Sequence, residues 1–156
     1  MLNDGSEAQA RVQAALVLME RKYPTSWVRL YDSKSAGLGQ GGNVIPPQPA
    51  DYIVVTDKQA CLLEIKSSNT YKSLAATTLR SMFKENQIMG ARMWRRAGRG
   101  AYCVFYSLQT KQFELWHMRD IVEAYLAPAR NRKLKVPPVK VFTEKEMVEV
   151  LYLNLI

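Results

Sequence analysis

The sequence predicts an α/β protein, with a mixed sheet of about five strands and helices on its faces. Three observations lead to this class. Residues 6–21 have the apolar spacing of an amphipathic helix. Two β-branched apolar runs, Tyr52–Val55 and Ala60–Ile65, are typical of a buried hairpin, and residues 101–107 and 112–117 have the pattern of two further strands.

The chain has 156 residues, of which 47% are hydrophobic, and we expect a single domain spanning 1–156. No apolar stretch approaches the roughly 18 residues of a membrane span, and the first residues lack the basic and apolar regions of a signal peptide. We therefore expect a cytoplasmic protein. Cys61 and Cys103 fall in predicted buried strands and are expected to be reduced core thiols. His117 is the only histidine, and we expect neither a His-Cys zinc site nor a Ser-His-Asp triad.

The helix predicted over residues 6–21 can be capped by Ser6, and Pro24 prevents its continuation. Glu7 and Glu20 are its only acids, and they lie about 140° apart around the helix axis, so both cannot point into one site. As an alternative, both are solvated charges. Its predicted buried face consists of Ala8, Val12, Ala15, Leu16 and Met19.

A strand predicted over Trp27–Tyr31 leads into a Gly/Pro-rich loop at residues 33–49, with four glycines and three prolines. This loop delivers the chain into Asp51, so we expect it to border a functional site. Lys34 and exposed backbone N–H groups in the loop could contact phosphates. The alternative is a connector that binds nothing.

The predicted hairpin brings charged side chains together. A two-residue turn at Asp57 and Lys58 places Asp51 opposite Glu64 on the neighbouring strand, where two like charges are destabilising. Strand alternation puts Lys66 on the same face. A divalent cation held between the two carboxylates would turn their repulsion into shared coordination. The alternative is a simple Glu64–Lys66 ion pair, with Asp51 capping the loop.

These residues resemble the signature of the PD-(D/E)XK nucleases, with Pro49-Ala50-Asp51 followed by Glu64-Ile65-Lys66. Within that superfamily the chain is most similar to the RecU-type Holliday junction resolvases. Asn86-Gln87-Ile88 and the strand 102–107 follow in that family's order, and the similarity covers roughly residues 5–126. The resemblance implies a restriction-endonuclease-like core.

The resemblance also implies roles for individual residues. Asp51, Glu64 and the Ile65 carbonyl would hold Mg²⁺ or Mn²⁺, which prefer hard oxygen ligands. A helical glutamate would complete this cluster; the resemblance favours Glu7, and Glu20 remains open. Lys66 would position or deprotonate the attacking water, and Gln87 would orient that water or a DNA phosphate.

The net charge of +8 favours a polyanionic partner. Residues 73–97 give the longest helical pattern, with a predicted apolar stripe that includes Leu79, Met89 and Met93. Glu85 is the only acid between residues 66 and 99. The cations of this stretch leave a surface suited to phosphates; with Lys66 set apart for the site, they are Lys72, Arg80, Lys84, Arg92, Arg95, Arg96 and Arg99.

The C-terminal part of the chain begins with a short helix predicted over Met118–Leu126. Residues 129–140 are predicted to form a basic loop, in which Arg130, Arg132 and Lys133 could also contact phosphates. Thr143 and Glu146 fit a capping box that opens a terminal helix.

Together these features favour a metal-dependent DNA endonuclease that hydrolyses phosphodiester bonds. The resemblance alone implies that it is structure-selective and acts on branched DNA, as a Holliday junction resolvase does. Paired cuts by such an enzyme imply a homodimer. The alternatives are a related nuclease acting on DNA ends or single strands, and a catalytically silent DNA-binding protein with the nuclease fold.

Overall fold

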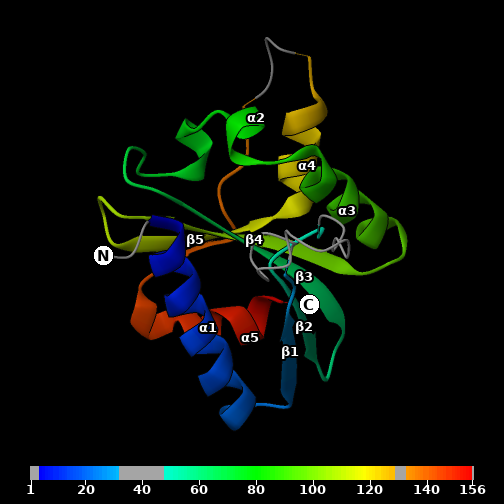
Figure 1. The fold of residues 1–156 in the computed structure, drawn as a ribbon, viewed down its shortest axis with the longest axis vertical. Coiled ribbons are helices and arrows are strands. Elements are labelled where there is room, and N and C mark those ends of the chain that lie inside the picture. The colour runs from blue at the N-terminus through cyan, green and yellow to red at the C-terminus, as the bar shows by residue number, and fades with distance from the viewer. Residues whose placement is uncertain (1–3, 32–47, 129–132, 156) are drawn as a thin grey trace, which may run out of the picture.

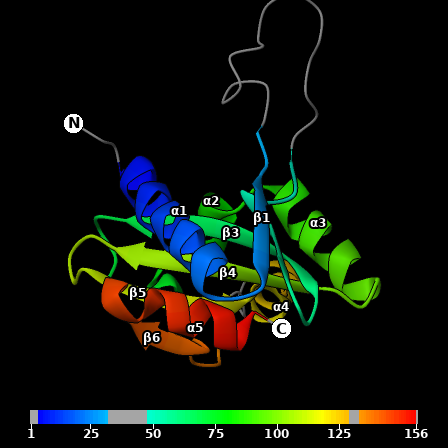
Figure 2. The same cartoon turned by 90° about the horizontal axis from the view of Figure 1, so that it is seen from below.

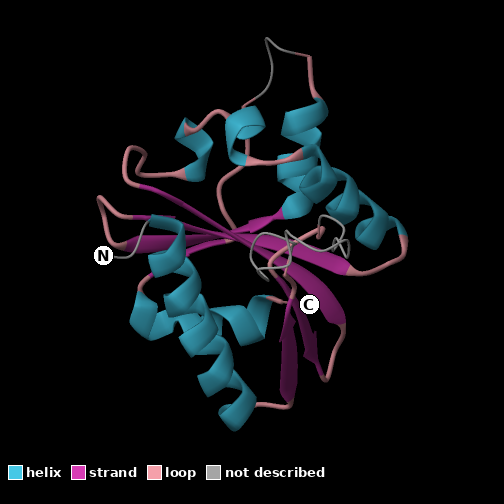
Figure 3. Ribbon diagram, viewed as in Figure 1, coloured by secondary structure: helices cyan, strands magenta, loops and turns pink. Residues whose placement is uncertain are grey.

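A six-stranded sheet divides the protein into two layers of helices (Figures 1 and 3). The computed structural model describes residues 4–31, 48–128 and 133–155. The strands follow one another across the sheet in chain order, and every neighbouring pair is antiparallel except β3 and β4. This confirms the predicted α/β class and the mixed sheet covered by helices, with six strands instead of about five. The strands are β1 (Thr25–Arg29), β2 (Tyr52–Thr56), β3 (Ala60–Ser68), β4 (Gly100–Ser107), β5 (Gln112–His117) and β6 (Lys140–Phe142).

One face of the sheet is covered by α1 (Asp4–Lys22) and α5 (Met147–Asn154), which lie across the near face in Figure 2. The predicted face of α1 is buried as expected, because Ala8, Val12 and Leu16 are fully inaccessible and pack on alternate residues of the strands. A short 3₁₀ turn, Glu144–Glu146, precedes α5. Glu146 accepts hydrogen bonds from the backbone N–H and hydroxyl of Thr143, which confirms the predicted capping box.

The other face is covered by α2 (Leu79–Met82), α3 (Glu85–Arg96) and α4 (Met118–Leu126), which lie on the opposite side of the sheet from α1 in Figure 1. The single helix predicted over residues 73–97 is wrong. The chain forms a 3₁₀ turn at Leu74–Ala76, then α2, then α3, with extended backbone at Phe83 and Lys84.

The break between α2 and α3 has a physical cause. In one continuous helix, Leu79 and Ile88 would point in opposite directions, since nine residues turn the helix by about 900°. The extended residues reset this phase, so that Leu79, Phe83 and Ile88 are all buried in one core. The predicted stripe is therefore wrong beyond the break, where Met89 and Met93 are exposed.

The strands differ from the predictions at several places. β3 runs on to Ser68, because its parallel partner β4 continues the pairing as far as Ser107. β6 lies within and just beyond the segment predicted to be a basic loop, and it pairs with β5 through Leu115, Glu114 and Phe113. β1 begins and ends two residues earlier than predicted. No helix in the described ranges is long and apolar enough to cross a membrane.

Candidate active site

The β2–β3 hairpin has the register that the sequence predicts. The backbone N–H of Thr56 donates to the Gln59 carbonyl at 2.9 Å and closes the turn, and Tyr52 pairs with Leu63 at the other end. One residue further, this register places Asp51 across from Glu64. The two acids therefore lie side by side where β2 begins.

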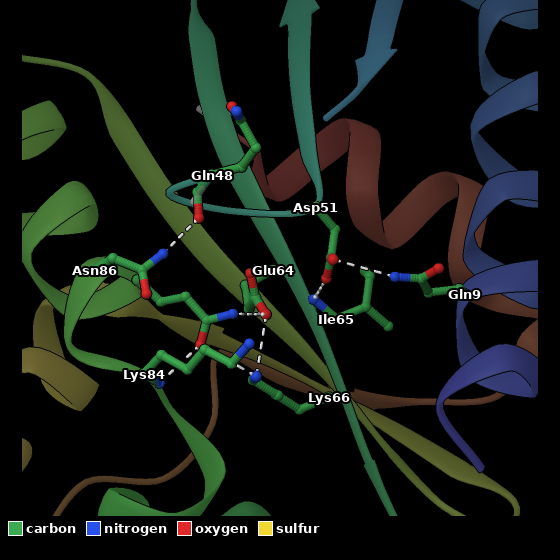
Figure 4. A network of polar contacts seen from close by, with 9 residues as sticks. Gln9, Gln48, Asp51, Glu64, Ile65, Lys66, Lys84 and Asn86 are labelled. Atoms are coloured by element: carbon green, nitrogen blue, oxygen red, sulfur yellow. Dashed lines mark hydrogen bonds and ion pairs between the residues drawn. The ribbon is translucent and has the colours of Figure 1, made fainter. Parts of the chain in front are cut away.

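Asp51 is held from two sides (Figure 4). Its Oδ2 accepts a hydrogen bond of 2.8 Å from the Ile65 backbone N–H in β3, and its Oδ1 accepts one of 3.1 Å from the Gln9 side chain in α1. Burial raises the pKa of Asp51, and the Ile65 N–H and the positive charge of Lys66 act in the opposite direction. The carboxylate is thus fixed in place by both the sheet and the first helix.

The segment that precedes Asp51 packs tightly against α3. Asn86 donates a hydrogen bond of 2.8 Å to the Gln48 carbonyl (Figure 4). At Gly90 an added Cβ would lie only 2.3 Å from the Cβ of Pro49, so only glycine allows this close approach. The start of β2 is therefore positioned by α3.

Glu64 is a buried acid, with 3% of its surface exposed. Its Oε1 accepts hydrogen bonds from Gln87 Nε2 at 2.9 Å and from Lys66 Nζ at 3.2 Å. Its Oε2 is buried and has no hydrogen-bond partner among the described residues. Such an orphaned carboxylate oxygen is costly unless a proton or a cation satisfies it.

The two carboxyl groups influence each other. Burial raises the pKa of Glu64 to about 8, the neighbouring Asp51 carboxylate adds to the rise, and Lys66 opposes it. When both acids are ionised neither can donate, which leaves Glu64 Oε2 without a partner. A proton on Glu64 allows it to donate to Asp51, and this hydrogen bond also favours the protonated form of Glu64. Without a cation, the pair therefore tends to share a proton.

Lys66 lies on the same face of β3 as Glu64. Its Nζ is 3.2 Å from Gln87 Oε1 and sits 5.1 Å from the centre of the Phe83 ring. The same Gln87 oxygen accepts a hydrogen bond of 2.9 Å from the Lys84 backbone N–H, so Gln87 is anchored in the first turn of α3. The structure thus brings together Asp51, Glu64, Lys66 and Gln87, four of the five predicted catalytic residues.

The fifth predicted residue, Glu7, makes other contacts. It accepts a hydrogen bond of 2.9 Å from Arg11, which also pairs with Glu144. Glu20 is exposed near the other end of α1. In the described part of the chain, no group of three His, Cys, Asp or Glu side chains is arranged to hold a metal ion. The acidic cluster expected from the resemblance is therefore a pair of acids, to which α1 contributes an amide.

That amide belongs to Gln9, which sequence reasoning missed. Gln9 donates to Asp51 and accepts a hydrogen bond of 2.7 Å from Arg29 in β1, so it links a guanidinium to the carboxylate. The charge of Arg29 also lowers the pKa of Asp51. An uncharged glutamine carries no sequence signal of this role; only its place two residues after Glu7 could have drawn attention to it.

The donor set suits a hard divalent cation. Asp51 and Glu64 supply carboxylate oxygens, and each Asp51 oxygen accepts one hydrogen bond and keeps a free lone pair. The Ile65 N–H points to Asp51, and in a strand the carbonyl of the same residue points to the same edge, beyond the end of β2. The partnerless Oε2 of Glu64 fits an ion at this place.

Most of the predicted phosphate-binding residues are exposed. Arg80 packs over the Tyr125 ring at 4.9 Å, and Lys133 lies on the surface beyond α4. The predicted contacts at Lys34, Arg130 and Arg132 lie outside the described residues, as does most of the loop 33–49. The other predicted side chains, all exposed, are Lys72, Lys84, Arg92, Arg95, Arg96 and Arg99.

Comparison with known proteins finds distant structural likeness and no match in sequence. No family model matches the chain, and no curated protein matches it. Among solved structures, Hjc, a Holliday junction resolvase from the archaeal hyperthermophile Archaeoglobus fulgidus, is similar to it with a TM-score of 0.45 and 13% sequence identity. The match covers 81% of this chain and 83% of that one.

Proposed function

We propose that this protein is a metal-dependent, structure-selective DNA endonuclease that hydrolyses phosphodiester bonds at branched DNA, as a Holliday junction resolvase does. One observation supports this above the others: the buried Glu64 carboxylate has an oxygen with no partner among the described residues, beside Asp51 and with Lys66 on the same face. The packing of apolar side chains does not explain why these charges lie together at the start of a hairpin. Binding of Mg²⁺ or Mn²⁺ would explain it.

The chemistry needs an electrophilic phosphorus and a positioned water. A bound divalent ion supplies Lewis-acid polarisation of the scissile phosphate and stabilises the charge that develops on it. Lys66, fixed by Glu64 and Gln87, places an ammonium group where it offsets phosphate charge and orients the attacking water. Gln87 holds the side chains of Glu64 and Lys66 in fixed relative positions, because it forms a hydrogen bond with each of them.

The preference for branched DNA rests on the resemblance of Pro49-Ala50-Asp51 and Glu64-Ile65-Lys66 to the RecU-type resolvases. Paired, symmetric cuts at a four-way junction need two active sites, and a homodimer provides them. The net charge of +8 and the exposed cations of α3 suit a polyanionic substrate.

A second candidate is a DNA-binding protein with this fold and no catalytic activity. The observation in its favour is that Gln9 contacts Asp51 where a third acid would otherwise complete the site. A site with two acids carries less negative charge, and it would hold a divalent ion more weakly.

The test compares cleavage of four-way, flap, single-stranded and linear duplex DNA in Mg²⁺ and in Mn²⁺. Wild-type protein should nick the four-way junction in preference to the linear duplex, and Asp51→Asn and Glu64→Gln should abolish nicking while retaining binding at low salt. Binding of DNA without nicking in either ion would favour the silent-binder candidate. Equal cleavage by wild type and Glu64→Gln would contradict the assignment of the active site.

A further inference from the structure

Several positively charged residues gather near the C-terminal end of α3, whereas Gln87 lies in its first turn. A pocket of about 330 Å³ there is lined by Arg95 and Arg99, by His117 and Arg119, and by the backbone around Gly100. None of these residues takes part in the Asp51–Glu64 network. The pocket is therefore distinct from the candidate active site.

Local structure explains why these residues meet. Gly98 ends α3 with a positive φ of 80°, and the Arg99 N–H then donates to the Trp94 carbonyl at 2.9 Å, which turns the chain back beside Arg95. His117 is the last residue of β5 and pairs with Tyr102 in β4. Arg119 follows in the first turn of α4.

The pocket has an excess of positive charge. Among the described residues, Arg95 and Arg99 form no ion pair, and Arg119 forms one with Asp120 alone, at 3.4 Å. The pKa of His117 is lowered, first by burial and then by the charge of Arg119, with a further contribution from Arg95 that Asp120 partly opposes. Cations this close together are stabilised when an anion lies between them.

We propose that this pocket binds a backbone phosphate of DNA, away from the phosphate that is cut. Guanidinium groups present paired N–H donors that match phosphate oxygens, and the turn at Gly98, which has no described atom beyond its chain neighbours within 4 Å of where a Cβ would lie, leaves room for a tetrahedral oxyanion. All three arginines are exposed, and Arg92 and Arg96 extend the positive surface along α3. An open site of this kind suits a polyanion that makes several contacts better than a free anion. The inference rests on the proposed function.

The sheet sets the distance between the two sites. Glu64 pairs with Cys103, and Gly100 at the pocket lies three residues earlier on β4. Three strand residues span about 10 Å along β4, so the pocket and Glu64 lie at different points along the same part of the sheet. A DNA strand could therefore contact the pocket with a phosphate other than the one that is cut.

His117 makes the pocket directly observable, because it is the only histidine in the chain. In tag-free protein without divalent ions, its ring signals in a ¹H–¹³C NMR spectrum should shift on addition of four-way junction DNA. The same shift should be lost in Arg119→Gln and strongly reduced in Arg99→Gln, but kept in Arg21→Gln, a control that removes a cation near the end of α1. A wild-type His117 signal that does not move with saturating DNA would overturn the proposal.

Inorganic phosphate at matched ionic strength is the second probe, and it separates the two sources of phosphate. The proposal expects a much smaller shift with inorganic phosphate than with DNA. A saturable shift with inorganic phosphate and none with DNA would assign the pocket to a free anion and overturn the DNA assignment.

The salt dependence of DNA binding gives an independent readout. Removing one phosphate contact should reduce the slope of log K against log salt by about 0.9. Arg95→Gln, Arg99→Gln and Arg119→Gln should each do so with unchanged thermal stability, whereas Arg21→Gln should not. Unchanged slopes in all three would contradict the proposal. These measurements need no cleavage, so a failure of the proposed nuclease activity, seen in the cleavage assay, is distinguishable from a failure of the pocket.

Discussion

Glu64 occupies a buried position in β3, where its neighbours Leu62, Leu63 and Ile65 are all apolar. Its hydrogen bonds satisfy one carboxylate oxygen and leave the other without a partner among the described residues. Ionisation of this acid is therefore unfavourable in free energy unless a further cation binds to the partnerless oxygen. The raised pKa of Glu64 expresses the same cost.

This cost predicts an unusual pH dependence of stability. The pKa of Glu64 rises from 4.5 in an exposed glutamate to about 8 in the fold, so the folded protein binds more protons than the unfolded chain between these values. Without divalent ions, the free energy of unfolding should fall as pH rises through this window, by up to about 1.4 kcal/mol per pH unit. Glu64→Gln should flatten the slope in urea unfolding measured from pH 5 to 8. An identical slope in the variant would contradict the assignment.

A substitution at Gln9 can add one negative charge to the site while the shape of the side chain stays almost the same. Gln9→Glu would place a third carboxylate beside Asp51, where Gln9 Nε2 now lies 3.1 Å from Oδ1. We expect a lower melting temperature without metal, and Mn²⁺ binding tighter by about tenfold or more. Titration calorimetry measures the affinity.

Gln13→Glu is the matched control for this change, because Gln13 lies one turn further along α1 and contacts the hydroxyl of Tyr52 instead of Asp51. An equal change in Mn²⁺ affinity in both variants would mean that Gln9 has no special place in the site.

The sequence predicted the residues of the site better than their partners. Asp51, Glu64 and Lys66 could be placed together because the period of a strand and a two-residue turn fix which side chains share a face. The contacts of Glu7 and Gln9 could not be predicted, because they depend on how α1 is rotated and inclined on the sheet, and both side chains lie near its start. The roles of His117 and Arg119 at one pocket depend equally on packing between distant segments.

At the scale of elements, α3 positions the start of β2 through the contact between Gly90 and Pro49. Gly90→Ala would normally favour a helix by about 1 kcal/mol, but here the new Cβ would overlap Pro49. We expect a net destabilisation of about 1–3 kcal/mol, together with weaker metal binding because Asp51 is displaced. Chemical unfolding and Mn²⁺ titration measure the two effects.

The double variant Gly90→Ala/Pro49→Gly tests the cause of this loss, since it removes the Cβ that the new methyl group would meet. Part of the lost metal affinity should return. If Gly90→Ala alone is more stable than wild type and binds Mn²⁺ normally, α3 does not position Asp51 in this way.

The predicted helix over residues 73–97 shows where periodicity fails. Apolar residues recur through this stretch, but no single helical phase can bury Leu79 and Ile88 together, and the core they share decides the break at Phe83. β6 was missed for a different reason. It is only three residues long, and its first two residues, Lys140 and Val141, are exposed, so its own sequence carries almost no strand pattern.

At the scale of the whole molecule, the proposed paired cuts require two copies of the site. We expect the protein to form a homodimer, and light scattering during size-exclusion chromatography should give twice the mass of one chain. A monomer both alone and on a four-way junction would contradict this expectation.

The central claim is that Asp51 and Glu64 together bind a divalent cation. The most direct measurement is Mn²⁺ binding by calorimetry to wild type, Asp51→Asn, Glu64→Gln and Glu114→Gln. Glu114 is a matched control: it is a buried acid on the same face of the sheet, and both of its hydrogen bonds go to one oxygen that an amide can replace. The account predicts that the first two substitutions abolish binding and that Glu114→Gln leaves it intact. Wild-type affinity in Asp51→Asn and Glu64→Gln would contradict it.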